Sequence, residues 1–227
     1  MHTVNVPLWA IKRGKSLNDF PLIEPLNTAL VVVDLQNAFV IKGQPISNPH
    51  ALGIVPLVNS LATKLRSAGG TVVWTRHTFT DLPPLALPAW QIIKGSRVWA
   101  SLAAMTVGTF SHALHANLDV LPQDLIIDKY RYSAFIHNSS DLDLKLRAKG
   151  IDTLIITGTV TNCCCESTAR DGNMLGYKIL FTSDATAALT DEEHNAALLN
   201  ISTLFGQICT ASEVEALIEA GSLRTNG

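Results

Sequence analysis

The amino-acid sequence predicts a three-layer α/β fold, in which helices cover both faces of a doubly wound, mostly parallel sheet of six strands. The run at residues 29–34, ALVVVD, is apolar up to its final carboxylate, which is typical of a central parallel strand buried on both faces. Similar runs alternate along the chain with segments of helical periodicity, which favours right-handed β-α-β units. If the strand order is 3-2-1-4-5-6, the first and fourth strands are neighbours where the order reverses.

The individual elements follow from local patterns. The first long helix has apolar residues at helical spacing from Ile54 to Leu65, and Gly69 ends it. Strands are expected at residues 29–34, 71–76, 125–129, 154–157, 178–182 and 207–210. Helices are expected at residues 49–69, 111–118, 142–149, 166–175, 192–204 and 212–220.

Length and composition predict one domain that acts on a small molecule. The chain has 227 residues, and we expect a single domain at residues 28–227 after an N-terminal arm at residues 1–27. The arm has no clear period, and we expect it to lie across the surface or a neighbouring subunit. Charged residues make up only 16% of the chain and the net charge is −2, which argues against a nucleic-acid partner. No apolar run reaches the roughly 18 residues of a membrane span.

The cysteines indicate a reducing compartment. Three of the four, Cys163, Cys164 and Cys165, are adjacent, and neighbouring residues are poorly placed to form a disulfide with one another. We therefore expect a cytoplasmic protein without a disulfide framework.

One segment interrupts the alternation of strands and helices. Residues 80–107 contain Pro83, Pro84 and Pro88, together with Trp90 and Trp99. A long loop in a compact domain is usually functional, so a lid or a specificity wall is expected, and a subunit contact is the alternative.

Reactive side chains stand where three of the predicted strands end. Asp34 ends the first strand, Lys129 ends the third, and the cysteines follow the fourth at the start of a helix. The carboxyl ends of parallel strands share one edge of the sheet, where ligands bind. A carboxylate, an ammonium and a thiol activated by a helix N-terminus are the parts of a nucleophilic amidase. The alternative is that the cysteines are simply compact apolar packing.

Three separated motifs add a resemblance to a known family. They read ALVVVDLQNAF, IIDKYRYSAF and GTVTNCCCESTARDG, and in this order they resemble the isochorismatase-like cysteine hydrolases. The resemblance implies an isochorismatase-like fold and places the catalytic triad of the family on Asp34, Lys129 and Cys164, with Cys164 as the nucleophile. It also implies a cis peptide between Thr159 and Val160, and an oxyanion hole formed by the backbone N–H groups of Val160 and Cys164.

Within the family, the motifs look most like those of ureidoacrylate and N-carbamoyl amide hydrolases. This resemblance implies an amidohydrolase that cleaves a C–N amide or ureido bond through a cysteine thioester and releases ammonia. It also leads us to expect a homo-oligomer, a dimer or tetramer, with a small amide or ureido substrate as its ligand. Substrate contacts are expected from Asn37, Phe39, His77, Tyr132 and Phe135.

Neither a cofactor nor a metal is expected. Nicotinamidases of the same superfamily carry a metal-binding aspartate and histidine with a further histidine after the second strand, whereas this chain has only His77 there. His112 and His115 have the spacing of metal ligands on a predicted helix, but with no third ligand nearby we expect ordinary helix residues.

Two functions of other kinds stay open on the sequence. One is hydrolysis of a vinyl ether, the reaction of the family's namesakes, which does not need a cysteine. The other is non-catalytic binding of a small molecule. A thiol of ordinary reactivity would favour this function over catalysis.

Overall fold

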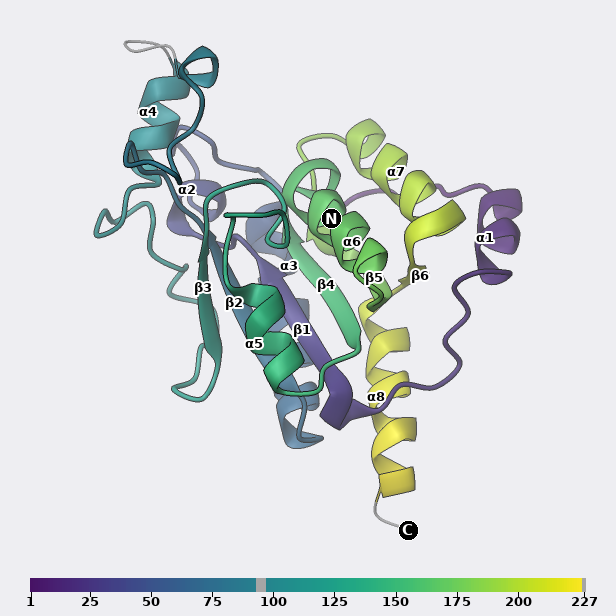
Figure 1. The fold of residues 1–227 in the computed structure, drawn as a ribbon. Helices are drawn as coiled ribbons and strands as arrows, with labels where there is room; N and C mark the ends of the chain where they lie inside the picture. Colours follow the sequence, from purple (N-terminus) through teal and green to yellow (C-terminus); the bar gives the residue numbers. More distant parts are fainter. Residues whose placement is uncertain (93–96, 226–227) are drawn as a thin grey trace.

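The computed structural model describes residues 1–92 and 97–225. All six strands run parallel in one sheet with the order β3-β2-β1-β4-β5-β6, which confirms the predicted topology (Figure 1). The order reverses between β1 and β4, so their carboxyl ends are neighbours. The strands are β1 (Thr28–Val33), β2 (Thr71–His77), β3 (Leu125–Lys129), β4 (Thr153–Thr159), β5 (Lys178–Ala187) and β6 (Gln207–Cys209).

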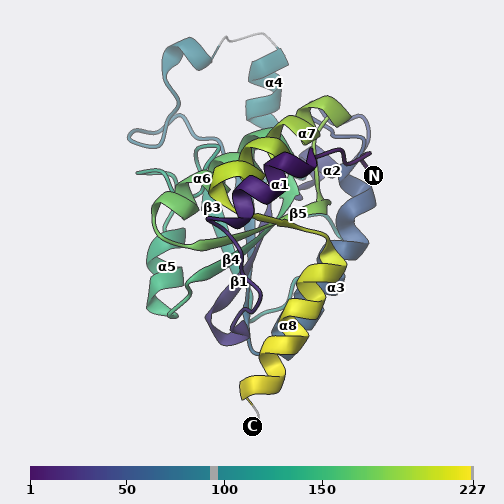
Figure 2. The ribbon, with the colours of Figure 1, turned by 90° about the vertical axis from the view of Figure 1, so that its right-hand side faces the viewer.

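Helices cover both faces of the sheet (Figure 2). On one face lie α3 (Ala51–Ser67) and α8 (Ala211–Thr225), and on the other lie α5 (Leu142–Ala148) and α6 (Glu166–Met174). The other helices are α1 (Leu8–Lys15), α2 (Asn37–Val40), α4 (Arg97–Ala104) and α7 (Asp191–Asn200). None of the helices in the described part of the chain is long and apolar enough to cross a membrane.

The apolar run of β1 is explained by its central place in the sheet. Leu30 and Val32 belong to the core cluster beneath α3 and α8, whereas Val31 and Val33 belong to the cluster beneath α5 and α6. Successive residues of a strand point to opposite faces, so burial on both faces requires an apolar residue at each position.

The predicted helix at residues 111–118 is wrong, because this segment is a series of turns. Its backbone bonds to the chain after β1: the N–H of Asn37 donates to the carbonyl of Ala113, and the N–H of His115 donates to the carbonyl of Leu35. Hydrogen bonds between distant segments have therefore replaced the local helix. His112 and His115 consequently lie in turns and not on a helix.

The N-terminal arm lies along its own domain and contains a helix, α1, that the sequence pattern did not indicate (Figure 2). The ring of His2 bonds to Asp191 at 2.7 Å, and the backbone N–H of Asn5 donates to Asn195 at 2.6 Å. Gly14 packs so closely on the carbonyl of Ser202 that a Cβ atom there would collide with it. These contacts tie the arm to α7 and to the turn that follows it.

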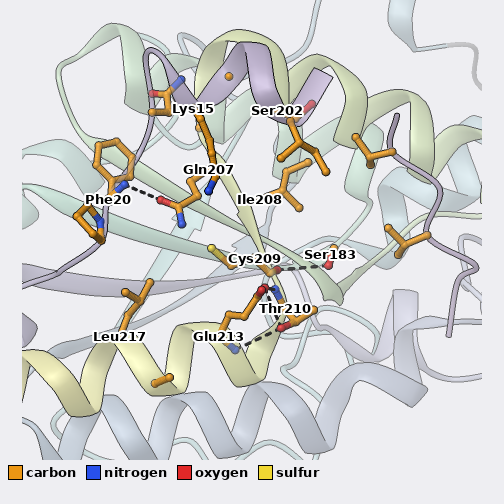
Figure 3. A pocket seen from close by; sticks show the side chains of 18 residues that line it. Lys15, Phe20, Ser183, Ser202, Gln207, Ile208, Cys209, Thr210, Glu213 and Leu217 are labelled. Atoms are coloured by element: carbon orange, nitrogen blue, oxygen red, sulfur yellow. Dashed lines mark hydrogen bonds between the residues drawn. The ribbon is translucent and has the colours of Figure 1, made fainter. Parts of the chain in front are cut away.

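A cavity of about 750 Å³ lies between this arm and the β6–α8 edge (Figure 3). Its polar groups largely bond to one another: the N–H of Phe20 donates to Gln207, and the N–H of Thr210 donates to Glu213, both at 2.7 Å. None of the predicted catalytic residues lines it.

The insertion at residues 80–107 carries helix α4 and extends beyond the carboxyl edge of the sheet (Figure 1). Residues 93–96 of the insertion lie outside the described residues. Leu102 and Met105 pack with Phe39 and Phe79 in a small core cluster, against which Val160 also lies. The insertion is therefore packed directly over the turn that follows β4.

Candidate active site

Asp34 and Lys129 meet inside the carboxyl edge of the sheet. Although β2 separates their strands, the Nζ atom of Lys129 lies 2.7 Å from Oδ2 of Asp34, and both side chains are fully buried. Asp34 has a φ of 51°, in the left-handed region that aspartate tolerates better than most residues. Burial alone would lower the pKa of Lys129, but the Asp34 carboxylate and the Cys164 thiol raise the pKa above its ordinary value. The lysine is therefore charged.

Strand β2 supplies the groups that hold this pair. Thr75 donates its hydroxyl to Oδ1 of Asp34 at 2.7 Å, which leaves Oδ2 for the ammonium. The Nδ1 atom of His77 lies 3.0 Å from Nζ of Lys129. Because an ammonium only donates, Nδ1 accepts and the ring proton is on Nε2. Burial, followed by the Lys129 ammonium, lowers the pKa of His77 to about 3, so its ring is neutral.

The turn between β4 and α6 presents the cysteines. The peptide between Thr159 and Val160 is cis, as the family resemblance implies, and a π-helical turn at Thr161–Cys165 leads into α6. The carbonyl of Val160 accepts the N–H groups of Cys163 at 3.0 Å and Cys165 at 3.2 Å. The N–H of Cys164, which lies between them in sequence, takes part in neither of these two bonds.

The three adjacent cysteines have three different surroundings. Cys164 faces the ion pair, because its sulfur, a carboxylate oxygen of Asp34 and a ring nitrogen of His77 all lie within 4.8 Å of one another. Cys165 is buried in the core and its thiol donates to the carbonyl of Thr157 at 3.8 Å. Cys163 is partly exposed. Only Cys164 is therefore directed at Asp34.

The pKa values of the thiols differ in direction. A hydrogen bond with Cys163, followed by burial, raises the pKa of Cys164 well above its ordinary value, and the Asp34 carboxylate adds to this while the Lys129 ammonium opposes it. The same hydrogen bond lowers the pKa of Cys163. The Cys164 thiol is thus protonated at rest, and a base must stand beside it for it to react.

Asp34, His77 and Cys164 form a group of potential metal ligands in the described part of the chain. The ammonium of Lys129 already lies at 2.7 Å from Asp34 and 3.0 Å from His77. It stands where a cation would bind these two residues, and repulsion between the two positive charges would weaken metal binding. The charge of Lys129 is thus a physical reason to expect no metal at this site, which stays a prediction.

Apart from His77, which accepts a hydrogen bond from the ammonium of Lys129, the predicted substrate contacts separate into two groups. Tyr132 is 58% exposed and its ring stacks on that of His77 with 5.9 Å between the centroids, while Phe39 packs in the cluster that touches Val160. Tyr132 therefore borders His77, and Phe39 borders the turn that follows β4. Asn37 instead donates to the carbonyl of Phe110 at 2.9 Å, and Phe135 packs against Tyr177 in the core beneath α6. These two side chains are used for structure.

Residues that the sequence pattern did not single out complete the site. Asn48 donates to the hydroxyl of Thr159 at 2.9 Å and to the carbonyl of Ala187 at 3.1 Å, and so holds the strand end before the cis peptide. Gln36 donates to the carbonyl of His77 and accepts its N–H. Neither side chain belongs to a local pattern, because their partners lie far away in sequence.

Comparison with known proteins shows the family. The model of the isochorismatase domain matches residues 28–213. A ureidoacrylate amidohydrolase, RutB, of Caulobacter vibrioides is 35% identical over 208 residues, which cover 84% of this chain and 91% of that protein. A cysteine hydrolase from Pseudomonas syringae pv. phaseolicola has a crystal structure with a TM-score of 0.79 and 30% identity, covering 89% of this chain and 99% of that one. The structure of an N-carbamoylsarcosine amidase from Thermoplasma acidophilum has a TM-score of 0.65 and 25% identity, with 82% and 96% covered. On this match and on its fold, the chain belongs to the isochorismatase family.

Proposed function

We propose that this protein is an amidohydrolase that cleaves a C–N bond of a small ureido or carbamoyl compound through a thioester on Cys164. The observation that carries the proposal is the position of the Cys164 thiol beside a buried Asp34–Lys129 pair. Relatives and structural neighbours that are named as amidohydrolases of ureido and N-carbamoyl compounds support the substrate class.

The first step is proton transfer from Cys164 to Oδ2 of Asp34. Before transfer, the site holds a carboxylate, an ammonium and a neutral thiol, and after it a carboxylic acid, an ammonium and a thiolate. The net charge is unchanged, so the negative charge only moves from one neighbour of Lys129 to the other. This is why a thiol whose pKa is raised at rest becomes a nucleophile without the cost of a new buried charge.

The thiolate then attacks the ureido or amide carbonyl. The backbone N–H groups of Val160 and Cys164 are the proposed donors to the oxyanion, a type of contact that is worth about 10²–10³ in rate. When the tetrahedral intermediate collapses, Asp34 gives its proton to the departing nitrogen, and ammonia leaves. The same carboxylate then takes a proton from water, whose oxygen attacks the thioester and releases the acid and the Cys164 thiol.

We also propose that the protein works in a reducing compartment and that it forms a homo-oligomer. The four cysteines are free in the structure, which supports a reducing compartment such as the cytoplasm. Exposed aromatic residues on and beside the insertion, Trp90 at 76% and Phe110 at 68%, support a homo-oligomer in which this segment contacts a second copy.

The test is a screen of ureido acids, carbamoyl amides and simple amides with ammonia as the readout. We expect ammonia from at least one ureido or carbamoyl compound, and none from the Cys164→Ala variant purified in parallel. Turnover of a vinyl ether without ammonia from any amide would replace this proposal by the isochorismatase reaction.

A further inference from the structure

His2 anchors the N-terminal arm with a side chain that is only 2% exposed. Its ring stacks on that of His194, with 4.3 Å between the centroids and 17° between the planes. It also lies against the ring of His50, with 4.2 Å between the centroids. The backbone N–H of Ala188 donates to Nε2 of His2 at 3.0 Å, and Nδ1 lies 2.7 Å from a carboxylate oxygen of Asp191. His2 therefore contacts the start of α3, the segment after β5 and helix α7.

Two hydrogen bonds orient the ring of His2. A backbone N–H only donates, so Nε2 accepts from Ala188 and the ring proton is on Nδ1, which donates to Asp191. Each ring nitrogen thus has the role that its partner requires. The contacts therefore fix the orientation of the ring as well as its position.

His194 connects His2 to the turn that carries the cysteines. Its Nε2 atom donates to the carbonyl of Ser183 at 2.9 Å, so its Nδ1 atom accepts the hydroxyl of Thr161 at 3.0 Å. Thr161 is the first residue of the π-helical turn and directly follows Val160. Because the ring of His2 covers one face of the His194 ring, it limits the tilt of the side chain that holds Thr161.

The residue before the cis peptide is held by a second set of contacts that also reaches His2. Asn48 donates to the hydroxyl of Thr159 at 2.9 Å. The amide oxygen of Asn48 accepts the backbone N–H of His50, also at 2.9 Å, and the ring of His50 lies on that of His2. The contacts of His2 thus lead to the turn on both sides of the cis peptide.

We propose that His2 is a positioning residue, which holds the turn between β4 and α6 in the geometry that stabilises the oxyanion. It acts through His50 and His194 and not by contact with the substrate. This inference rests on the proposed function, in which the N–H of Val160 is one of the two oxyanion donors. Donors aimed at a developing charge are effective only when their surroundings hold them in place beforehand. The N-terminal arm is thus part of the scaffold of the active site.

Hydrogen exchange of the turn tests this role without an assay of activity. The variant His2→Ala removes the ring from between its two neighbours. Backbone amides in a peptide that covers residues 159–165 should exchange at least about fivefold faster in His2→Ala than in the wild-type protein, because the turn opens more easily. Mass spectrometry of the quenched and digested protein measures this difference.

The matched control is Asn195→Ala, which loosens the same arm on the same helix. The side chain of Asn195 accepts the N–H of Asn5 at 2.6 Å and donates to the carbonyl of Thr3 at 2.9 Å. Its loss removes two bonds of the arm but leaves the ring of His2 in place. Exchange in residues 159–165 should change by less than about twofold in this variant.

The kinetic test separates positioning from a general loss of stability. With the best substrate of the ammonia screen, His2→Ala should lower kcat by about tenfold or more, because misplaced donors bind the transition state less well. KM should change by less than about threefold, since an interaction made in the transition state is lost and not one with bound substrate. Asn195→Ala should retain the kcat of the wild-type enzyme. Urea unfolding checks that both variants are folded at the temperature of the assay.

The outcomes distinguish this inference from the proposed function. Unchanged exchange of residues 159–165 in His2→Ala, an unchanged kcat, or equal effects of His2→Ala and Asn195→Ala would overturn the positioning role and leave the amidohydrolase proposal standing. Absence of ammonia from every ureido and amide compound would overturn the amidohydrolase proposal and, with it, the role of His2 in catalysis. Support of the turn by His2 would then be decided by hydrogen exchange alone.

Discussion

The ammonium of Lys129 and the carboxylate of Asp34 lie 2.7 Å apart, and neither side chain is exposed to solvent. Two opposite charges in a buried site stabilise each other only as a pair, because each alone would carry the full cost of desolvation. The pair therefore contributes to folding. In the mechanism that we propose it also serves the chemistry, because Asp34 accepts the proton of Cys164 and Lys129 stabilises the resulting thiolate.

A double-mutant cycle separates these two contributions. Asp34→Asn and Lys129→Met should each abolish ammonia release, and each should lower the free energy of unfolding by about 3–5 kcal/mol, because one buried charge is left unpaired. The double variant should regain much of the stability and none of the activity. Urea unfolding and ammonia assays measure both. Additive losses of stability would show that the two charges do not interact, and substantial turnover by Asp34→Asn would remove this residue from the mechanism.

The three cysteines should separate by function. Cys164→Ala should eliminate turnover, whereas Cys163→Val and Cys165→Val should retain activity within about tenfold and change mainly stability, on the order of 1 kcal/mol. Acid quenching during turnover and peptide mapping should place the acyl group on Cys164. Brief treatment with iodoacetamide should instead label Cys163 first, because this thiol is partly exposed and its pKa is lowered. An active Cys164→Ala enzyme would disprove the assignment.

Gly158 should tolerate no side chain. Its φ is 105°, and a Cβ atom would lie against the backbone of Val33, 2.5 Å from the nitrogen and closer still to the carbonyl oxygen. Gly158→Ala should therefore lower the free energy of unfolding by about 3 kcal/mol or more and displace β4 from β1. Gly176→Ala is the matched control, since its φ is 91° and no atom lies near its Cβ position. Equal losses in the two variants would show that strain at positive φ alone accounts for the effect.

Acid should destabilise the fold through a buried histidine. Burial, with a contribution from His2, lowers the pKa of His194 from 6.5 to about 4. The folded state therefore binds this proton less readily than the unfolded state. The stability that this provides is complete above pH 6.5 and is lost as the pH falls toward 4, at up to about 1.4 kcal/mol per pH unit.

The variant His194→Gln tests whether protonation of His194 causes the loss of stability in acid. The ring donates from Nε2 to the carbonyl of Ser183 at 2.9 Å and accepts at Nδ1 from Thr161 at 3.0 Å, and an amide offers both a donor and an acceptor. Urea unfolding at pH 7.5, 6 and 5 should show a smaller loss of stability with acid in the variant than in the wild-type protein. Identical pH dependence would assign the acid sensitivity to other groups.

The sequence by itself determined the class of fold, the order of the strands and the positions of Asp34, Lys129 and the cysteine turn. Burial on both faces leaves a continuous apolar run in a parallel strand, and the residue that ends the run lies at the ligand edge, so these features can be read locally. Contacts between distant segments decided the rest. They turned residues 111–118 away from a helix, directed Phe135 into the core and Cys164 toward Asp34, and gave Arg131 backbone carbonyls as hydrogen-bond partners. No local pattern records such outcomes, because each depends on which backbone and side-chain groups the fold brings together.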